Sequence, residues 1–261
     1  MNLGLEGKTA WIGGSSKGLG RACAEALAKE GVRVVLTSRN TAELEIAVQE
    51  MRSNGFDVSG GPADFSSPET VSQAIDQVIA DIGRIDIAVI NSGGPVAGNF
   101  MELKNSEWDD WYYGTLGYIR DICKALLPGM AERKWGRVIT ITSLVASEPE
   151  SSLALSSVFR GGVLNLVKIL SSDFAKEGVT VNNVSPGAFK TDRAIQLMKD
   201  RSSRTGETLE EIEADAVRNL PMGRYQAPEE CGNVVAFLSS DLSSGITGVN
   251  IRIDGGIAKG I

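Results

Sequence analysis

Short runs of apolar residues alternate along the chain with longer segments in which apolar residues recur every three or four positions. The short runs are rich in valine and isoleucine and occupy residues 8–14, 32–39, 85–94, 136–143, 179–187 and 249–256. Such alternation is typical of parallel strands joined by helical crossovers, with both faces of the sheet covered. We therefore predict an α/β fold with a doubly wound parallel sheet of about seven strands and helices on both faces.

The chain is predicted to form one domain over residues 1–261, because it contains no repeat, no low-complexity tract and no Pro/Gly/Ser-rich linker. The exception to the strand and helix rhythm is residues 190–224, where two charged helical segments are joined by a Ser/Arg/Thr/Gly connection. Two interpretations of this insertion stay open: a mobile helical lid over a substrate, or a solvated helical excursion.

Composition narrows the class of partner. The formal net charge is -7, which disfavours nucleic acid and anionic membranes as partners. The three cysteines, Cys23, Cys123 and Cys231, are scattered and odd in number, so they predict neither a disulfide framework nor a metal site. The N-terminus lacks the pattern of a signal peptide, and no stretch reaches the ~18 apolar residues of a membrane helix. We expect a cytoplasmic protein.

Histidine is absent from the whole chain. This absence removes the commonest general acid or base and the commonest metal ligand. Any proton chemistry must therefore use carboxylates, hydroxyls, lysine or cysteine.

A glycine-rich loop follows the first predicted strand, in the sequence WIGGSSKGLGRA at residues 11–22. Gly14, Gly18 and Gly20 lie between that strand and the first predicted helix, where glycine lets the backbone turn tightly and approach a pyrophosphate. The free amides and the positive end of the helix favour the negative charge. A glycine-rich turn without a ligand is the alternative, and the position at the start of an α/β pattern disfavours it.

The spacing G-x-x-x-G-x-G resembles the T-G-x-x-x-G-I-G opening of the short-chain dehydrogenase/reductase family, with Gly13 where threonine is usual. Further segments match the family in order and spacing: Asp64 in PADFSS, NSGGP at 91–95, SPGAFKTD at 185–192 and SSGITGVNIRIDGG at 243–256. The resemblance covers essentially the whole chain and implies a single-domain Rossmann fold. The cofactor-binding residues that it implies are Gly14, Ser16, Lys17, Gly18, Leu19, Gly20, Ser38, Arg39, Asp64, Asn91, Gly93, Pro186, Gly187 and Thr191.

The residues after the second predicted strand bear on the choice of nicotinamide cofactor. An NAD-selective site places an acid there to bind the ribose 2'-hydroxyl, but this chain has Ser38 and Arg39. These residues, with Lys17 in the glycine loop, suit a 2'-phosphate. We therefore expect NADP(H) to be favoured over NAD(H); the alternative is that both cations are merely solvated.

The family's catalytic tetrad of asparagine, serine, tyrosine and lysine is changed in this chain. Ser143 stands at the position of the family's serine, but Ser156 replaces the tyrosine and Arg160 replaces the lysine, while Thr115 aligns with the asparagine. We take these four residues as the candidate catalytic set. A serine hydroxyl is far less acidic than a phenol, and arginine stays charged and does not release a proton. We therefore expect the protein to bind the cofactor even where the family's usual catalysis is lost.

Three tyrosines and two glutamates are the alternative candidates for a proton donor. Tyr112, Tyr113 and Tyr118 share the helix that carries Thr115, and we expect them mainly to be core or interface aromatics. Glu148 and Glu150 lie in the loop that lines the substrate pocket in the family; a desolvated carboxyl there would have a raised pKa. Solvated loop acids are the preferred interpretation of both.

The leading hypothesis is an NADP(H)-dependent oxidoreductase that transfers hydride between the nicotinamide and a carbonyl or alcohol substrate, similar to a 3-oxoacyl reductase. The alternative is a cofactor-binding family member without reductase activity, either a regulatory subunit or a non-redox enzyme such as a dehydratase. An interaction module that binds no nucleotide is a third, weaker hypothesis. Gly161 and Gly162, in a helix predicted at about 152–177, suggest close contact with a second subunit, and the resemblance implies a homotetramer or homodimer.

Overall fold

The structure is a computed structural model that describes residues 2–260, apart from the side chains of residues 193, 197 and 200. Its centre is a parallel sheet of seven strands in the order β3-β2-β1-β4-β5-β6-β7. The strands are β1 (Thr9–Gly13), β2 (Arg33–Ser38), β3 (Val58–Pro62), β4 (Ile87–Ile90), β5 (Gly136–Ile141), β6 (Val179–Pro186) and β7 (Asn250–Ile253). The predicted Rossmann fold is thus confirmed.

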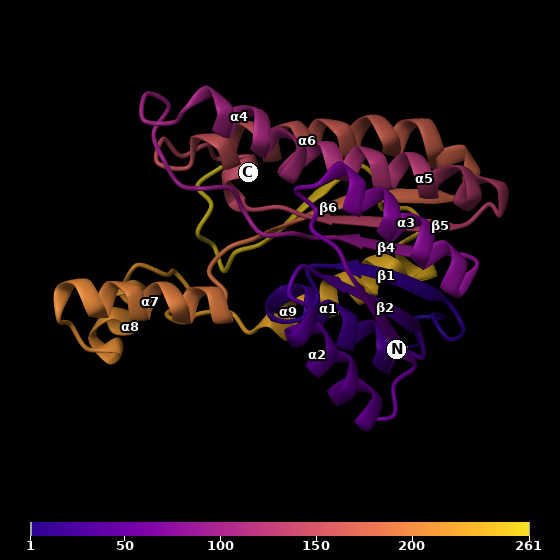
Figure 1. The fold of residues 1–261 in the computed structure, drawn as a ribbon, viewed down its shortest axis with the longest axis horizontal. Coiled ribbons are helices and arrows are strands. Elements are labelled where there is room, and N and C mark those ends of the chain that lie inside the picture. The colour runs from indigo at the N-terminus through magenta and orange to yellow at the C-terminus, as the bar shows by residue number, and fades with distance from the viewer. Residues whose placement is uncertain (1, 261) are drawn as a thin grey trace.

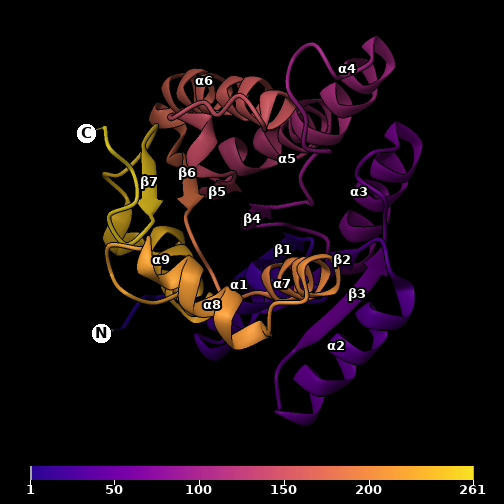
Figure 2. The ribbon, with the colours of Figure 1, turned by 90° about the vertical axis from the view of Figure 1, so that its left-hand side faces the viewer.

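Helices cover both faces of the sheet, as Figures 1 and 2 show. The helices are α1 (Gly18–Lys29), α2 (Thr41–Ser53), α3 (Pro68–Ile82), α4 (Asn105–Tyr112), α5 (Tyr118–Glu132), α6 (Ala154–Phe174), α7 (Asp192–Thr205), α8 (Leu209–Arg218) and α9 (Pro228–Ser239). One apolar core joins α1, α2 and α9 to the sheet, and a second joins α3, α5 and α6 to the opposite face. The inner strands β1, β2, β4, β5 and β6 are largely buried, which explains their continuous apolar runs, whereas the edge strands β3 and β7 are partly exposed.

The helix α6 lies against the sheet and runs on into a 3-10 turn at Ala175–Glu177. By length and mean hydropathy alone, Ala154–Glu177 passes for a membrane-spanning helix, but polar residues and the charged Arg160 and Lys168 interrupt it, so it is not a run of ~18 apolar residues. Val163 and Val167 of this helix are buried in the core between α5, α6 and the sheet. Its apolar character is therefore that of a helix packed in a protein core.

The strand order reverses between β1 and β4, the two neighbours from which the chain winds outward in opposite directions. In open α/β sheets, ligands bind at the carboxyl ends of the strands at this switch point. The glycine loop leaves β1 and the segment from Asn91 leaves β4 at that place. The fold therefore brings the two loops together although they are about 75 residues apart in sequence.

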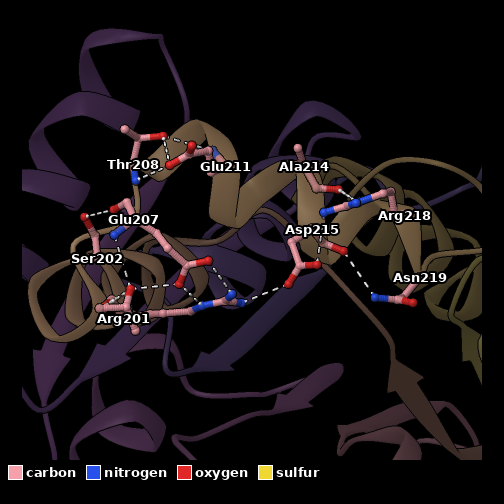
Figure 3. A network of polar contacts seen from close by, with 10 residues as sticks. Arg201, Ser202, Glu207, Thr208, Glu211, Ala214, Asp215, Arg218 and Asn219 are labelled. Atoms are coloured by element: carbon pink, nitrogen blue, oxygen red, sulfur yellow. Dashed lines mark hydrogen bonds and ion pairs between the residues drawn. The ribbon is translucent and has the colours of Figure 1, made fainter.

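The insertion predicted at residues 190–224 forms the two helices α7 and α8, which stand out from the body of the protein in Figure 1. The two helices hold each other through charged side chains, as Figure 3 shows. Arg201 of α7 binds Glu207 in the connection at 2.9 Å and Asp215 of α8 at 3.2 Å. The ion pairs of Arg201 with Glu207 and Asp215 thus join α7 to α8, and we call these contacts the clasp.

Candidate active site

The glycine loop has the conformation that the sequence predicts. Gly14 and Gly18 have φ values of 56° and 60°, in the left-handed region that glycine adopts without strain. Gly20 lies in the first turn of α1, and a Cβ on it would collide with the main-chain oxygen of Gly14. The loop therefore needs glycine at each of these positions, and it leaves the amino end of α1 open to a phosphate group.

A cavity of about 760 Å³ lies beside this loop. Seven of the predicted cofactor-binding residues line it: Gly14, Ser16 and Lys17 from the loop, Ser38 and Arg39 after β2, Asp64 after β3 and Gly93 after β4. The volume is in the range of cofactor sites. The fold therefore brings seven of the predicted cofactor-binding residues around one cavity.

The far end of the cavity is polar and carries two cations. The Oγ atoms of Ser16 and Ser38 lie 2.9 Å apart in a hydrogen bond. Lys17 forms an ion pair with Glu43 at 2.8 Å, and Arg39 is exposed on the rim. No carboxylate occupies the position of Ser38 or Arg39 at the end of β2. This end of the cavity therefore suits a phosphate better than a free ribose hydroxyl.

Asp64 lies on the same cavity wall, where its carboxylate accepts hydrogen bonds from the Ser66 amide at 3.0 Å and the Ser66 hydroxyl at 2.7 Å. Burial opposes ionisation of this carboxyl, but the two hydrogen bonds and the charge of Arg39 leave its pKa below the usual value. The carboxylate is therefore ionised at neutral pH and is available as a hydrogen-bond acceptor.

Asn91 and Leu19 support the loop instead of lining the cavity. Asn91 donates hydrogen bonds of 3.3 Å to the main-chain oxygens of Gly13 and Gly14, and Leu19 packs against the apolar core. A Cβ on Gly13 would come within 2.5 Å of the Phe65 ring and 2.6 Å of the Asn91 oxygen. This contact explains why threonine is absent at position 13.

The segment after β6 reaches the glycine loop. Pro186 ends the strand, and Gly187 passes so close to β7 that a Cβ would lie 2.7 Å from the Cα of Asp254. Thr191 caps the amino end of α7, and its Cβ lies 3.8 Å from the place that a Cβ on Gly18 would take. Thr191 therefore lies beside the glycine loop, whereas Gly187 packs beside Asp254, and none of Pro186, Gly187 and Thr191 lines the cavity.

Arg160 connects the ends of two strands. Its Nη1 donates a hydrogen bond to the main-chain oxygen of Thr142, next to Ser143, and its Nη2 lies 3.3 Å from the place of a Cβ on Gly94. Its Nε is buried without a hydrogen-bond partner among the described residues. Burial lowers the pKa of Arg160, and the nearby Tyr118 hydroxyl opposes that shift. The guanidinium thus lies between the loop after β4 and the end of β5.

Ser156 and Thr115 lie on the elements expected for them, and both are buried. Ser156 is on α6, one turn before Arg160. Thr115 is in a π-helical turn at Tyr113–Gly117, a distortion that often marks functional sites, and its Oγ1 has no hydrogen-bond partner in the described part of the chain. Within residues 2–260, no hydrogen bond joins the side chains of Ser143, Ser156 and Thr115.

The three tyrosines near Thr115 have different surroundings. Tyr112 is exposed, Tyr113 donates to Asp121 at 3.0 Å, and the buried Tyr118 donates to the Oγ of Ser92 at 3.0 Å. Burial raises the pKa of Tyr118 to about 12, although the Ser92 hydrogen bond and the Arg160 charge act in the opposite direction. Tyr118 therefore has a buried ring and a hydroxyl that reaches Ser92 in the segment after β4.

The loop acids are hydrogen-bonded to other groups. Glu148 accepts hydrogen bonds from the main-chain amides of Lys259 and Gly260, at 2.7 and 2.6 Å. Glu150 accepts one from the hydroxyl of Ser152 at 2.5 Å. Glu148 thus ties the carboxyl-terminal segment to the loop after β5, a structural contact that the sequence does not predict.

The glycine pair of α6 has an explanation within the subunit. A Cβ on Gly162 would lie 3.2 Å from the Cδ2 of Leu116 in the π-helical turn, and one on Gly161 would lie 3.5 Å from the main-chain oxygen of Ala146. The close packing inferred from these glycines is therefore found inside the chain. Their interpretation as a mark of subunit contact is not needed.

No group of three or more His, Cys, Asp or Glu side chains with the arrangement of a metal site occurs among the described residues.

The sequence model described as enoyl-(acyl carrier protein) reductase matches residues 14–258. The chain is 30% identical over 255 residues to 3-oxoacyl-(acyl-carrier-protein) reductase FabG of Escherichia coli, covering 98% of this chain and 99% of that protein. This chain belongs to the short-chain dehydrogenase/reductase family.

Solved structures of family members agree with the fold. The L-sorbose reductase of Gluconobacter frateurii, solved with NADPH and L-sorbose, has a TM-score of 0.96 at 28% identity, with all of both chains covered. A 3-oxoacyl (acyl-carrier-protein) reductase of Agrobacterium tumefaciens, solved with NADP bound, has a TM-score of 0.89 at 31% identity, covering 98% of this chain and 96% of that one.

Eleven of the cavity residues of this family member were not predicted from the sequence, among them Glu43, Ser92 and Trp111. The sequence indicates Glu43 by its position, because it lies four residues after Arg39, in the first turn of α2. Ser92 lies inside the matched segment NSGGP but received no role. Nothing in the sequence indicates Trp111, because its position in the cavity wall depends on how α4 packs.

Proposed function

We propose that this short-chain dehydrogenase/reductase is an NADPH-dependent reductase of carbonyl compounds, of the 3-oxoacyl reductase type. The observation that carries the proposal is the polar end of the cavity, where Lys17, Ser38 and Arg39 stand and where β2 ends without a carboxylate. Two cations and two hydroxyls suit a 2'-phosphate. The relatives solved with NADPH or NADP support the same cofactor.

The residues present fit this cofactor on structural grounds. Gly14, Gly18 and Gly20 leave the amino end of α1 open, so the pyrophosphate would bind there. Asp64 would accept a hydrogen bond from the adenine. Arg160 has a buried Nε without a partner among the described residues, and this donor would bind a ribose hydroxyl, because an unpaired buried donor is costly.

When bound, NADPH supplies the hydride that reduces the carbonyl carbon. The hydroxyl of Ser143 donates a hydrogen bond to the carbonyl oxygen of the substrate, and the Arg160 charge stabilises the negative charge that develops on that oxygen. Neither Ser156 nor Arg160 is suited to release a proton near neutral pH. Water therefore delivers the proton to the oxygen in this proposal, and the proton step is slower than with a tyrosine.

A second function is favoured by one observation. Arg160 already donates a hydrogen bond to the main-chain oxygen of Thr142, so it has a structural role that needs no substrate. A cofactor-binding regulatory subunit, or a non-redox enzyme such as a dehydratase, would retain the cavity and this contact without transferring hydride. Under this alternative, the double variant Ser156→Tyr with Arg160→Lys creates reductase activity if only the acid and its activator are missing.

Three further assignments belong to the proposal. The helices α7 and α8 form a lid that closes over the substrate, held as one unit by Arg201. The protein acts in the cytoplasm, where its three unpaired cysteines stay reduced. The subunits assemble into a homodimer or homotetramer, as the family resemblance implies.

The experiment is a fluorescence titration of the purified protein with NADPH and with NADH, followed by a panel of ketones and 3-oxoacyl thioesters monitored at 340 nm. The proposed function predicts tighter binding of NADPH and its consumption with at least one carbonyl compound. Tight NADPH binding with a flat absorbance trace across the panel would favour the non-redox function. Failure to bind either cofactor would exclude both functions.

A further inference from the structure

The ion pair between Lys17 and Glu43 lies in the wall of the cavity, at the end assigned to the 2'-phosphate. We propose that Glu43 competes with this phosphate for Lys17, and so limits the affinity for NADP(H) without affecting the affinity for NAD(H). This inference rests on the proposed function, because it concerns the same cofactor site. It assigns a role in specificity to a carboxylate that the sequence did not single out.

The two charged groups come from the glycine loop and from the start of α2, which face each other. Lys17 precedes Gly18 in the glycine loop, and Glu43 is in the first turn of α2. Their side chains meet at 2.8 Å while remaining 56% and 39% exposed. Ion pairs with this much exposure contribute little net stability. Lys17 can therefore exchange Glu43 for another anion at little cost.

Glu43 also neutralises the amino end of α2. Asn40 caps that helix and accepts a hydrogen bond of 3.2 Å from the Glu43 amide. The amino end of a helix carries a partial positive charge, which a carboxylate in the first turn offsets. The Glu43 carboxylate therefore offsets both positive charges, the Lys17 ammonium and the helix end, that a phosphate at this end of the cavity would use.

A phosphate that binds at this end of the cavity meets Arg39 and the hydroxyls of Ser16 and Ser38 as partners. It also meets the negative charge of Glu43, and it gains Lys17 only when Lys17 changes partner. A cofactor without the 2'-phosphate requires no such exchange. The effect of Glu43 is therefore confined to the phosphorylated cofactor, which distinguishes it from a residue that merely supports the fold.

The test compares Glu43→Gln with the unchanged protein in fluorescence titrations with NADPH and NADH. Glutamine keeps the size of the side chain and leaves the hydrogen bond from the residue 43 amide to Asn40 in place. The matched control is Glu45→Gln, because Glu45 is an exposed acid on the same helix that does not line the cavity. Thermal unfolding of all three proteins verifies that the fold is retained.

We expect Glu43→Gln to tighten NADPH binding by about two- to fivefold, the range that an exposed ion pair provides. The gain should shrink as salt is added, because salt screens exposed charges. NADH binding should stay unchanged, and Glu45→Gln should alter neither cofactor. Weaker NADPH binding, an equal change for NADH, or no change at all would overturn the inference. If the unchanged protein binds no NADPH, the proposed function itself fails, which is a separate outcome.

Discussion

The guanidinium of Arg160 donates a hydrogen bond to the main-chain oxygen of Thr142, the residue immediately before Ser143. This contact fixes the guanidinium against the main chain next to Ser143, whose hydroxyl is proposed to bind the substrate oxygen. A lysine has a single point charge, whereas the planar guanidinium presents several donors at once. Arg160 can therefore hold the end of β5 with one nitrogen and retain Nε for a ligand.

Variants at position 160 test whether the charge of Arg160 contributes to the reaction. In Arg160→Ala we expect kcat to fall by about 10²-fold, because a charge near the developing negative oxygen is lost. Arg160→Lys should recover part of this loss, since the cation is kept. Steady-state NADPH consumption measures both variants, with Arg120→Ala as the control, because Arg120 is bound to Asp121 on α5. Unchanged kcat in Arg160→Ala would show that the cation takes no part in the reaction.

The buried Tyr118 predicts a loss of stability in alkali. Its pKa is raised to about 12 by burial, above the value of about 10 in an unfolded chain. The folded state therefore holds its proton more tightly, and the resulting stability is present below pH 10 and declines as the pH rises toward 12. By pH 11 the unchanged protein should lose about 1 kcal/mol more than Tyr118→Phe, relative to pH 8.

Urea unfolding at pH 8 and pH 11 measures this difference. The phenylalanine keeps the ring that stacks on Phe65 at 5.1 Å between centroids, so only the hydroxyl is removed. Tyr112→Phe at an exposed position serves as the control and should behave like the unchanged protein. Parallel pH dependence in the Tyr118→Phe variant and the unchanged protein would contradict the raised pKa.

The close approach inside the glycine loop predicts that Gly20 tolerates no side chain. In Gly20→Ala the added methyl group would collide with the Gly14 main-chain oxygen, so the loop must move and NADPH binding should weaken at least tenfold. Overpacking of this kind costs about 1–3 kcal/mol of stability. Gly61→Ala is the control, because a Cβ there meets no atom within 4 Å. Cofactor titration and thermal unfolding measure the two effects, and normal NADPH binding in Gly20→Ala would refute the assignment of the loop.

The clasp between α7 and α8 predicts coupled motion of the two helices. Arg201→Ala removes the ion pairs with Glu207 and Asp215, so backbone amides across 192–218 should exchange hydrogen faster. Arg218→Ala removes contacts within α8 alone, with Asp215 and with the main-chain oxygen of Ala214, and should have a smaller effect. Hydrogen exchange read by mass spectrometry resolves this segment. Equal exchange in Arg201→Ala and the unchanged protein would mean that the clasp does not hold the helices together.

The fold was predictable because its signals are local. The inner strands are short runs of buried residues and the crossovers have helical periodicity, so alternation indicates a parallel sheet. The edge strand β3, with the sequence VSGGP, has no such apolar run. The glycine loop was predictable for the same reason, since Gly14 and Gly18 are needed by their own backbone conformations. Residues with such requirements reveal their role without knowledge of their neighbours.

The rest of the site depends on contacts between distant segments. The pairing of Lys17 with Glu43 joins residues 26 positions apart, and that of Tyr118 with Ser92 joins residues equally far apart. No periodicity encodes such contacts, because either partner alone resembles an ordinary surface or core residue. The length of α6 was predictable, but the reason for its glycine pair was not, since Gly162 makes room for Leu116 of another element.

The close approach of the Phe65 ring to Gly13 couples the side chains that these two positions can carry. A threonine at position 13, the residue usual in the family, would meet both the Phe65 ring and the Asn91 oxygen. A side chain at position 13 therefore requires both a smaller residue at position 65 and a shift of the chain after β4. Positions 13 and 65 can thus be redesigned only as a pair, because no single substitution at position 13 fits beside the Phe65 ring.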